Sequence, residues 1–401
     1  MRILSFTDQL GIGGSQVNAI ELAAALQNIH GFEVSLFGNP GPMVNLIRAK
    51  GLRYIPSPHP GFLPSPGRIR ALRESIRNER PALVHVWDWW QCLDAFYGVH
   101  VPMRIPMIAT VMEMTIPRLL PKRLPTTFGT PDLVAEAKLQ GRNPVALLVP
   151  PVDVETNAPD VSDPGSFFDQ WSLDESEIKL ITISRLATHL KGESLHRTID
   201  AVGRLAHTLP IKFIIVGDGP ERAALERRAA DINKKVGRDC VLVIGPMLDP
   251  RSAYAAADIF IGMGGSALRA MAFHKPVIVV GENGYSSCFL PETAESIYQK
   301  GLYGSGDGDP ENQALVSNIC KLASMSRDWP RLGQFSRQFV VSRFSIEAVS
   351  ERFAQLCRAT AAEPISMCAA GFDVLRTAAL YIKERRFTWD WGPEPIPTKE
   401  Y

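Results

Sequence analysis

The stretch DIFIGMGGSALRAMAFHKPVIVV, residues Asp258–Val280, sets the fold of the second half of the chain. Its opening apolar run predicts a buried strand, which Gly264 and Gly265 interrupt. Ser266 is a good helix N-cap residue, and strong helix formers follow it. A proline then ends the helix, and the closing VIVV run predicts another strand. The stretch therefore predicts a strand, glycine turn, helix and strand in succession.

This glycine turn has the features of a phosphate site. Glycines let a ligand approach the backbone closely, and a helix start offers free N–H groups at the positive end of the helix dipole. A phosphate or diphosphate suits that arrangement. A plain turn without a ligand is the alternative that the stretch leaves open.

Length and composition describe an ordinary globular protein. The chain has 401 residues, which predicts about two domains. A formal net charge of +1 gives no indication of nucleic acid or an anionic membrane as a partner. The six cysteines include no C-x-x-C pair, so we expect a reducing compartment and neither a disulfide framework nor a metal site. No apolar run reaches the roughly 20 residues that span a bilayer, and we expect a cytoplasmic protein.

The N-terminal half begins with a second unit of the same kind. Arg2–Thr7 predicts a strand, Gly13 and Gly14 lie in a glycine loop, and Ser15–Gln27 predicts a helix with an apolar face. This is a Rossmann-like pattern. The glycine spacing differs from the dinucleotide fingerprint, so an anion or substrate loop is favoured over NAD binding.

Three polar side chains follow buried strands of this half. His85 and Asp88 lie at the end of the strand Leu83–Trp87, and Glu113 follows the strand Pro106–Val111. Ligands bind at the carboxyl ends of the strands in open α/β sheets, so all three are candidate site residues. A histidine satisfied in the core and a carboxylate in solvent are the alternatives.

The second half carries two cations after a strand. Arg185 and Lys191 bracket a turn that follows the strand Lys179–Ser184. Fixed cations there could hold a diphosphate, and ordinary surface charge is the alternative. The stretch Pro150–Pro164 is rich in proline and aspartate, and we expect the interdomain linker there.

Together these segments resemble family 4 glycosyltransferases of the GT-B fold. The segments that carry the resemblance are Gly13-Gly14, SRL…KG (184–192), VGDGPERAALE (216–226) and ADIF…GGSALRAMAFHKPVI (257–278). VGDGP and RAMAFHKPVI are the most specific of them. The resemblance covers nearly the whole chain, and Pro151-Val152-Asp153 also matches a family segment between the domains.

The resemblance implies an α/β fold with two Rossmann-like domains facing across a cleft. We expect an acceptor domain at 1–155, a nucleotide-sugar donor domain at 156–360, and a C-terminal helix and tail at 361–401 that return to the first domain. The implied reaction is glycosyl transfer with retention at the anomeric carbon, without a metal or a cofactor. The implied partners are a nucleotide-sugar donor and a glycan, lipid-linked or small-molecule acceptor. Nucleic acid is not expected, and peripheral contact with a membrane is left open.

The resemblance also implies roles for individual residues. Arg185 and Lys191 take the family's diphosphate-binding, catalytic positions. The remaining implied residues fall into two groups: Gly217, Gly219, Gly264, Gly265, Ser266 and Arg269 for the donor, and Gly13, Gly14, His85, Asp88 and Glu113 for the acceptor or the cleft.

The sequence also departs from the family pattern. Two glutamates eight residues apart are usual around the glycine turn, and Ile261 and Arg269 stand there. Met112 stands where the family often has a histidine. These departures keep two alternatives open: a GT-B-fold binding protein with weak or no activity, and another GT-B enzyme such as a sugar-nucleotide epimerase.

Overall fold

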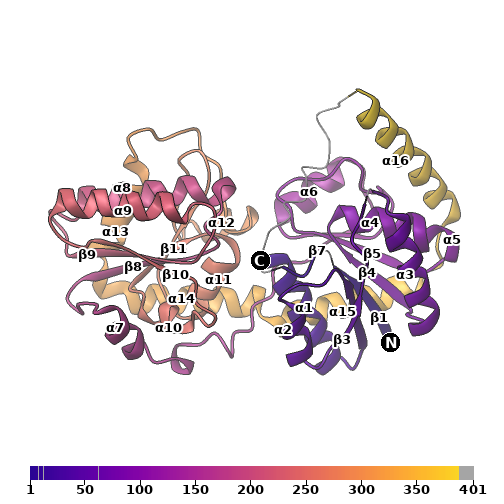
Figure 1. The fold of residues 1–401 in the computed structure, drawn as a ribbon, viewed down its shortest axis with the longest axis horizontal. Coiled ribbons are helices and arrows are strands. Elements are labelled where there is room, and N and C mark those ends of the chain that lie inside the picture. The colour runs from indigo at the N-terminus through magenta and orange to yellow at the C-terminus, as the bar shows by residue number, and fades with distance from the viewer. Residues whose placement is uncertain (8, 12, 62, 388–401) are drawn as a thin grey trace. The chain divides into compact units, whose positions relative to one another are not determined.

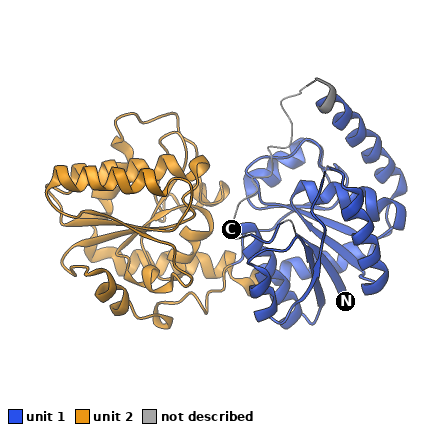
Figure 2. Ribbon diagram, in the orientation of Figure 1, with its two compact units in different colours: residues 1–151, 349–401 blue, residues 152–348 orange. Residues whose placement is uncertain are grey.

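The computed structural model describes residues 1–7, 9–11, 13–61 and 63–387, and the chain divides into two compact units (Figures 1 and 2). Unit 1 comprises Met1–Pro151 and Val349–Tyr401, and unit 2 comprises Val152–Ala348. The sequence predicts the two boundaries between these parts of the chain after residues 155 and 360. The aromatic tail residues Trp389 and Trp391 lie outside the described residues.

Unit 1 is built on a seven-stranded parallel sheet in the order β3-β2-β1-β4-β5-β6-β7. Its strands are rich in β-branched and aromatic residues and are mostly buried, as expected for a parallel sheet covered on both faces. The strands are β1 (Arg2–Phe6), β2 (Glu33–Gly38), β3 (Arg53–Pro56), β4 (Leu83–Trp87), β5 (Met107–Val111), β6 (Thr126–Phe128) and β7 (Val145–Leu147).

The helices of unit 1 include the last two of the chain. They are α1 (Gly14–Asn28), α2 (Val44–Ala49), α3 (Pro66–Glu79), α4 (Trp89–Ala95), η1 (Phe96–His100), α5 (Val101–Met103), α6 (Pro131–Leu139), α15 (Ile346–Ala362) and α16 (Met367–Phe387). Helix α15 buries Val349, Phe353 and Cys357, and the Phe353 ring packs 4.5 Å from that of His85 in β4. The C-terminal segment thus completes the core of the unit that the N-terminal segment begins.

Unit 2 has a six-stranded sheet in the order β10-β9-β8-β11-β12-β13. Only the pair β12 and β13 is antiparallel among these strands. The strands are β8 (Ile178–Ile183), β9 (Ile211–Val216), β10 (Val241–Gly245), β11 (Ile259–Gly262), β12 (Val277–Val280) and β13 (Ser286–Cys288). The order reverses between β8 and β11, the place where ligands bind in such sheets.

The helices of unit 2 cover both faces of this sheet. They are η2 (Pro159–Val161), α7 (Gly165–Trp171), η3 (Thr188–Gly192), α8 (Glu193–Leu205), α9 (Arg222–Val236), α10 (Arg251–Ala256), α11 (Gly264–Ala272), α12 (Ala294–Gln299), α13 (Gln313–Ser324), η4 (Ser326–Asp328) and α14 (Trp329–Phe344). The predicted class, α/β with two Rossmann-like domains, is confirmed.

Among the helices of the described residues, none is by itself both long and apolar enough to cross a membrane. Two consecutive helices reach the length and apolar composition of a membrane span only when they are counted together, Ile346–Ala362 and Met367–Glu384. They are bent by 105° relative to each other.

Candidate functional site

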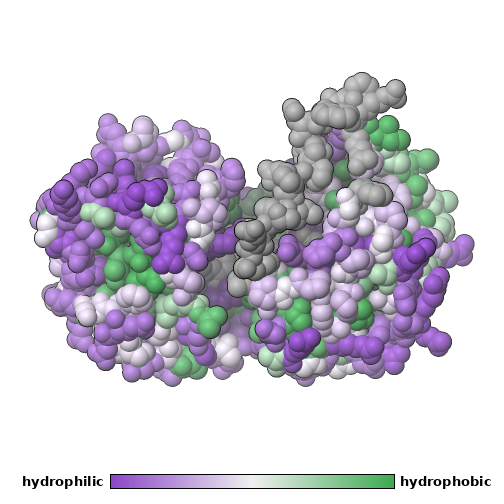
Figure 3. All heavy atoms as spheres, viewed as in Figure 1, coloured by the Kyte–Doolittle hydropathy of each residue, from purple (hydrophilic) through white to green (hydrophobic). Residues whose placement is uncertain are grey.

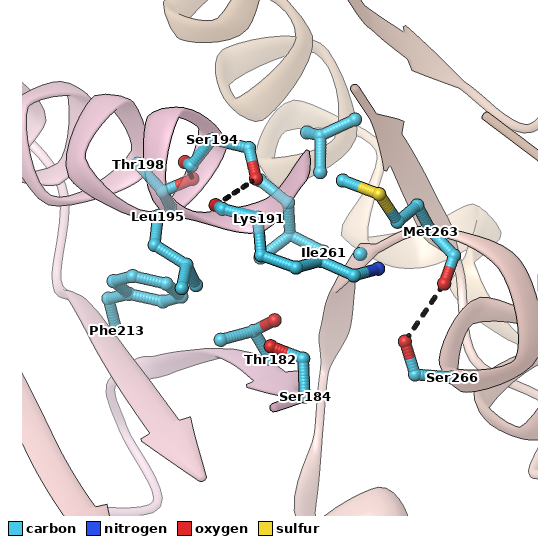
Figure 4. Close-up of a pocket in the computed structure, with 12 residues that line it drawn as sticks. Thr182, Ser184, Lys191, Ser194, Leu195, Thr198, Phe213, Ile261, Met263 and Ser266 are labelled. Atoms are coloured by element: carbon cyan, nitrogen blue, oxygen red, sulfur yellow. Dashed lines mark hydrogen bonds between the residues drawn. The ribbon is translucent and has the colours of Figure 1, made fainter. Parts of the chain in front are cut away.

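A recess in unit 2 opens where the strand order reverses. It is lined by residues at the carboxyl ends of β8 and β11, by the first turn of α8, and by the start of α11 (Figure 4). Lys191 and Ser266, two residues predicted for the donor site, lie in its lining together with Ser184. Ile261, which stands at a family glutamate position, is a buried apolar wall of the recess.

The Lys191 ammonium points across this recess toward Met263 and Ser266 (Figure 4). The backbone carbonyl of Lys191 is fixed, since the Ser194 hydroxyl donates to it at 2.9 Å. The ammonium itself makes no hydrogen bond or ion pair with any residue that the structure describes. Burial without a partner disfavours the charged form and lowers the pKa of Lys191 from 10.5 to about 8.

Ser184 supplies a second group without a partner. Its hydroxyl oxygen is buried and has no hydrogen-bond partner among the described residues. Buried hydroxyls are nearly always hydrogen-bonded in folded proteins. A buried hydroxyl and a largely buried ammonium, both without a partner among the described residues, indicate a site for an anionic oxygen ligand.

The start of α11 differs from the prediction. The helix begins at Gly264, with Met263 as its N-cap residue, so Ser266 lies inside the first turn and is not the N-cap. The Ser266 hydroxyl donates to the Met263 carbonyl at 3.1 Å. The Gly264 N–H donates to the Leu302 carbonyl at 2.9 Å, so the expectation that it is free for a ligand is wrong. The N–H groups of Gly265 and Ser266 belong to the open first turn, where helical N–H groups lack partners inside the helix.

Arg269 lies in the second turn of α11. Its side chain runs back toward the helix start, and its Nη1 donates to the Gly265 carbonyl at 3.3 Å. The Arg269 charge also acts on the buried hydroxyl of Tyr254, where it opposes the rise in pKa to about 12 that burial causes. The guanidinium therefore adds positive charge beside the first turn of α11.

Arg185 is exposed and does not line the recess, although it directly follows Ser184. Gly217 and Gly219 hold the loop that contains it. The Leu186 N–H donates to the Asp218 carbonyl at 2.8 Å, between the two glycines. A Cβ on Gly219 would lie 2.4 Å from the Leu186 carbonyl oxygen. In this structure the two predicted donor-binding glycines thus support the loop after β8.

His85 lies in the core of unit 1. Its Nε2 is 2.7 Å from the Thr110 hydroxyl oxygen, and the ring packs against Trp87 and Phe353. Burial disfavours the charged ring and lowers its pKa to about 3. The prediction of a histidine at the cleft is therefore corrected: His85 is a neutral core histidine, the alternative that the sequence left open.

Asp88 and Glu113 lie near each other at the carboxyl edge of the unit 1 sheet. Burial raises the pKa of Glu113, and the Asp88 carboxylate raises it further. Asp88 has a φ of +65°, which is rare for a residue other than glycine, and its carboxylate accepts from the Met112 N–H at 3.4 Å. Gly13 is the N-cap of α1 and Gly14 its first residue, after β1 in the same sheet.

Two features of unit 2 escaped the sequence reasoning. Ser184 was named only as part of the segment 184–192 and not as a site residue, although a hydroxyl at the end of a strand is a pattern that the sequence shows. Glu193 was not singled out at all, and its carboxylate accepts from the Asn283 and Gly284 N–H groups at 2.9 and 2.8 Å. Glu193 thereby ties the loop after β12 to the start of α8, a contact between segments 90 residues apart.

Two family models match the chain, one in each unit. The model described as Glycosyltransferase Family 4 matches residues 12–123, and the model described as Glycosyl transferases group 1 matches residues 177–322. A curated relative, the lipopolysaccharide 1,2-N-acetylglucosaminetransferase of Salmonella typhimurium, is 25% identical over 156 residues. The match spans 36% of this chain and 39% of the length of that relative.

Solved structures share the fold over most of the chain. A glycosyltransferase from Rickettsia africae has a TM-score of 0.71 at 15% identity, with 90% of this chain and 99% of that one covered. Anabaena Alr3699/HepE in complex with UDP has a TM-score of 0.68 at 16% identity, with 90% and 100% covered. At such identities the likeness concerns the fold. With both family models and the GT-B architecture in agreement, the chain belongs to the family 4-like glycosyltransferases.

Proposed function

We propose that the protein is a retaining glycosyltransferase that binds a nucleotide-sugar donor in unit 2, with the diphosphate at the mouth of the recess beside Lys191. The observation that carries this is the inward-pointing Lys191 ammonium, which lacks a partner among the described residues. A diphosphate oxygen would compensate the charge that burial now disfavours. The complexes of HepE with UDP and with UDP-glucose support a donor of this class.

The reaction requires that the leaving group, a nucleoside diphosphate, be stabilised. The bond between the sugar C1 and the diphosphate oxygen breaks, an acceptor hydroxyl oxygen bonds to C1 on the same face, and the nucleoside diphosphate leaves with the proton that the acceptor hydroxyl gives up. Negative charge grows on the diphosphate as that bond breaks, and fixed donors aimed at it lower the barrier. Lys191, the N–H groups of Gly265 and Ser266, and the exposed Arg185 at the same strand end supply that stabilisation.

The proposal extends to the acceptor and to the cellular setting. Asp88, Glu113 and the α1 start at Gly13 and Gly14 would contact the hydroxyls of a glycan acceptor, as the name of the Salmonella relative suggests for its own reaction. The reaction would use neither a metal nor a cofactor. All six cysteines are unpaired thiols, which supports a reducing compartment such as the cytoplasm.

A donor panel tests the proposal. The wild-type chain is incubated with individual nucleotide sugars, and release of nucleoside diphosphate is measured with and without candidate acceptors. Lys191→Ala and Arg185→Ala should each lower kcat about 100-fold, the scale for losing one charge partner of a transition state. Arg227→Ala, an exposed arginine on α9, is the matched control and should leave kcat unchanged.

The outcomes separate the competing functions. Product with the donor's anomeric configuration supports retention, and the inverted configuration contradicts it. Epimerised sugar formed without an acceptor would indicate an epimerase of the same fold. Failure to bind any nucleoside diphosphate would favour the binding protein without activity, which the family match does not favour.

A further inference from the structure

Helix α16 packs onto unit 1 through a face that carries apolar side chains, which contact the core, and the charged residues Asp373 and Arg376. The Asp373 carboxylate accepts from the backbone N–H groups of Lys122 and Arg123 at 2.9 and 2.7 Å. One helical turn further on, the Arg376 guanidinium donates to the carbonyls of Leu120 and Arg118 at 3.1 and 2.7 Å. The inner face of α16 is thus fixed to the basic loop Arg118–Leu124 by charge-assisted hydrogen bonds.

The outer face of the same helix is apolar. Phe372, Leu375 and Ile382 are 48%, 75% and 60% exposed, and they recur at helical spacing along one side. Met367 at the helix start is 40% exposed, and the small residues Gly371 and Ala379 lie on the same stripe. Figure 3 shows this stripe as a green band along α16. Helix α16 also packs Val374, Leu380 and Tyr381 against the core of unit 1, so the exposed stripe is a second apolar side where a surface helix normally carries polar residues.

Positive charge borders the apolar stripe. The Arg123 guanidinium lies over the Phe372 ring, 4.6 Å from its centroid, and Lys383 is exposed one residue after Ile382. Arg118 is exposed in the loop that the helix holds. Among the α16 residues whose side chains are described, none of the exposed ones is acidic, because Asp373 is buried and Glu384 is half-buried.

We propose that the outer face of α16 is a docking surface for an anionic lipid bilayer. Apolar side chains along one helix face with cations at its border are the features of helices that lie in the membrane interface, where anionic headgroups attract the cations. The inner face of α16, with its apolar contacts and hydrogen bonds, holds the helix on unit 1, so the helix lies on the bilayer and does not cross it. This surface is independent of the donor recess, which belongs to unit 2.

A second copy of the chain fits the same face less well. Two copies meeting at this stripe would bring Arg118, Arg123 and Lys383 of each toward like charges of the other. Like-charge contacts in an interface are unfavourable, whereas phosphate-bearing headgroups complement them. Charge complementarity therefore selects the bilayer as the occupant.

Vesicle flotation of the full chain tests the proposal. Vesicles of phosphatidylcholine alone are compared with vesicles that also contain phosphatidylglycerol. The wild type should float with the anionic vesicles, and Leu375→Gln/Ile382→Gln should bind them about tenfold more weakly or worse. Leu248→Gln, which changes a fully exposed leucine of unit 2, is the matched control and should bind as the wild type does.

Three results would overturn the proposal. The first is that the wild type does not float with anionic vesicles, and the second is that the double variant floats as well as the wild type does. The third is that the wild type is a dimer in solution and the double variant is a monomer. Because the side chains of Leu375 and Ile382 are exposed, the double variant should keep the thermal melting curve of the wild type. Loss of flotation with an intact nucleotide affinity separates this surface from the donor site.

Discussion

Gly217 lies directly against Ser184: a Cβ built on Gly217 would be 1.9 Å from the Ser184 carbonyl oxygen. The Gly217 φ of +151° is also one that side-chain-bearing residues rarely adopt. The chain can pass from β8 into the loop with Arg185 and Lys191 only because residue 217 has no side chain. The proposed donor site therefore depends on a glycine that does not line the recess.

Replacement of Gly217 by alanine should destabilise unit 2 and weaken nucleotide binding together. The clash is with backbone, which cannot move aside cheaply, so we expect a loss of about 3 kcal/mol or more. Gly237→Ala is the matched control, because Gly237 also has a positive φ, +81°, but no atom within 4 Å of the added Cβ. It should cost about 1 kcal/mol. Equal losses for both variants in urea unfolding would show that the contact with Ser184 is unimportant.

The affinity for a nucleoside diphosphate should fall as the pH rises above the pKa of Lys191. That pKa is about 8 without ligand, and an anion favours the protonated form, so binding at higher pH must take up a proton. We expect UDP to bind roughly tenfold more weakly near pH 9.5 than near pH 7.5. Isothermal titration calorimetry measures this, and Lys191→Arg is the control because its charge does not titrate in that range.

The stability of the ligand-free protein should rise with pH, whereas its affinity for the nucleotide should fall. The pKa of Lys191 is lowered by folding, from 10.5 to about 8, so the unfolded chain binds more protons between these values. The cost of burying the ammonium is full below pH 8 and disappears as the pH approaches 10.5. Relative to Lys191→Met, the wild type should gain stability over this window. A constant difference between the two unfolding free energies would contradict it.

Arg269→Glu should lower donor affinity or change donor preference. The substitution reverses the charge beside Gly265 and removes the contact with the Gly265 carbonyl. Arg269→Gln removes the contact and the positive charge without introducing a negative one, and should have an intermediate effect. Binding of both variants within about twofold of wild type, under roughly 0.5 kcal/mol, would make Arg269 a structural residue of α11.

Glu113→Gln should stabilise unit 1 near neutral pH. Partial burial and the neighbouring Asp88 raise the pKa of Glu113 by more than a hydrogen bond with Trp89 lowers it, so the fold disfavours the ionised form of this largely exposed side chain. The advantage of the variant should shrink as the pH falls below 4.5, where the wild-type carboxyl is protonated in both states. Glu136→Gln, on the exposed face of α6, serves as the comparison in thermal unfolding. A Glu113 variant that is less stable at neutral pH would show that its carboxylate has a favourable partner.

Periodicity and glycine placement were sufficient to predict most of the fold. The strand predicted at Lys179–Ser184 is β8, and the strand, helix and strand predicted for Asp258–Val280 are β11, α11 and β12. Helix α14 was missed, because its buried residues include Gly333 and Ser336, whose small size suits close packing and gives no apolar period. A Cβ on Gly333 would lie 1.9 Å from the His274 carbonyl oxygen.

The site was predictable only in part, because hydrogen bonds between distant segments decide which groups stay free. The sequence identifies Lys191 but cannot show that its ammonium lacks a partner. It identifies Gly264 but not that Leu302 occupies its N–H group. His85 was placed at the cleft from its strand end, whereas the aromatic ring of Phe353, far along the chain, encloses it.

The division of unit 1 into two segments imposes an order on folding during synthesis. Residues 152–348 are continuous, so all of unit 2 can leave the ribosome and fold while unit 1 still lacks α15 and α16. Until then the core positions around His85 that Phe353 fills are exposed. The unit whose translation begins first is thus the last to be completed.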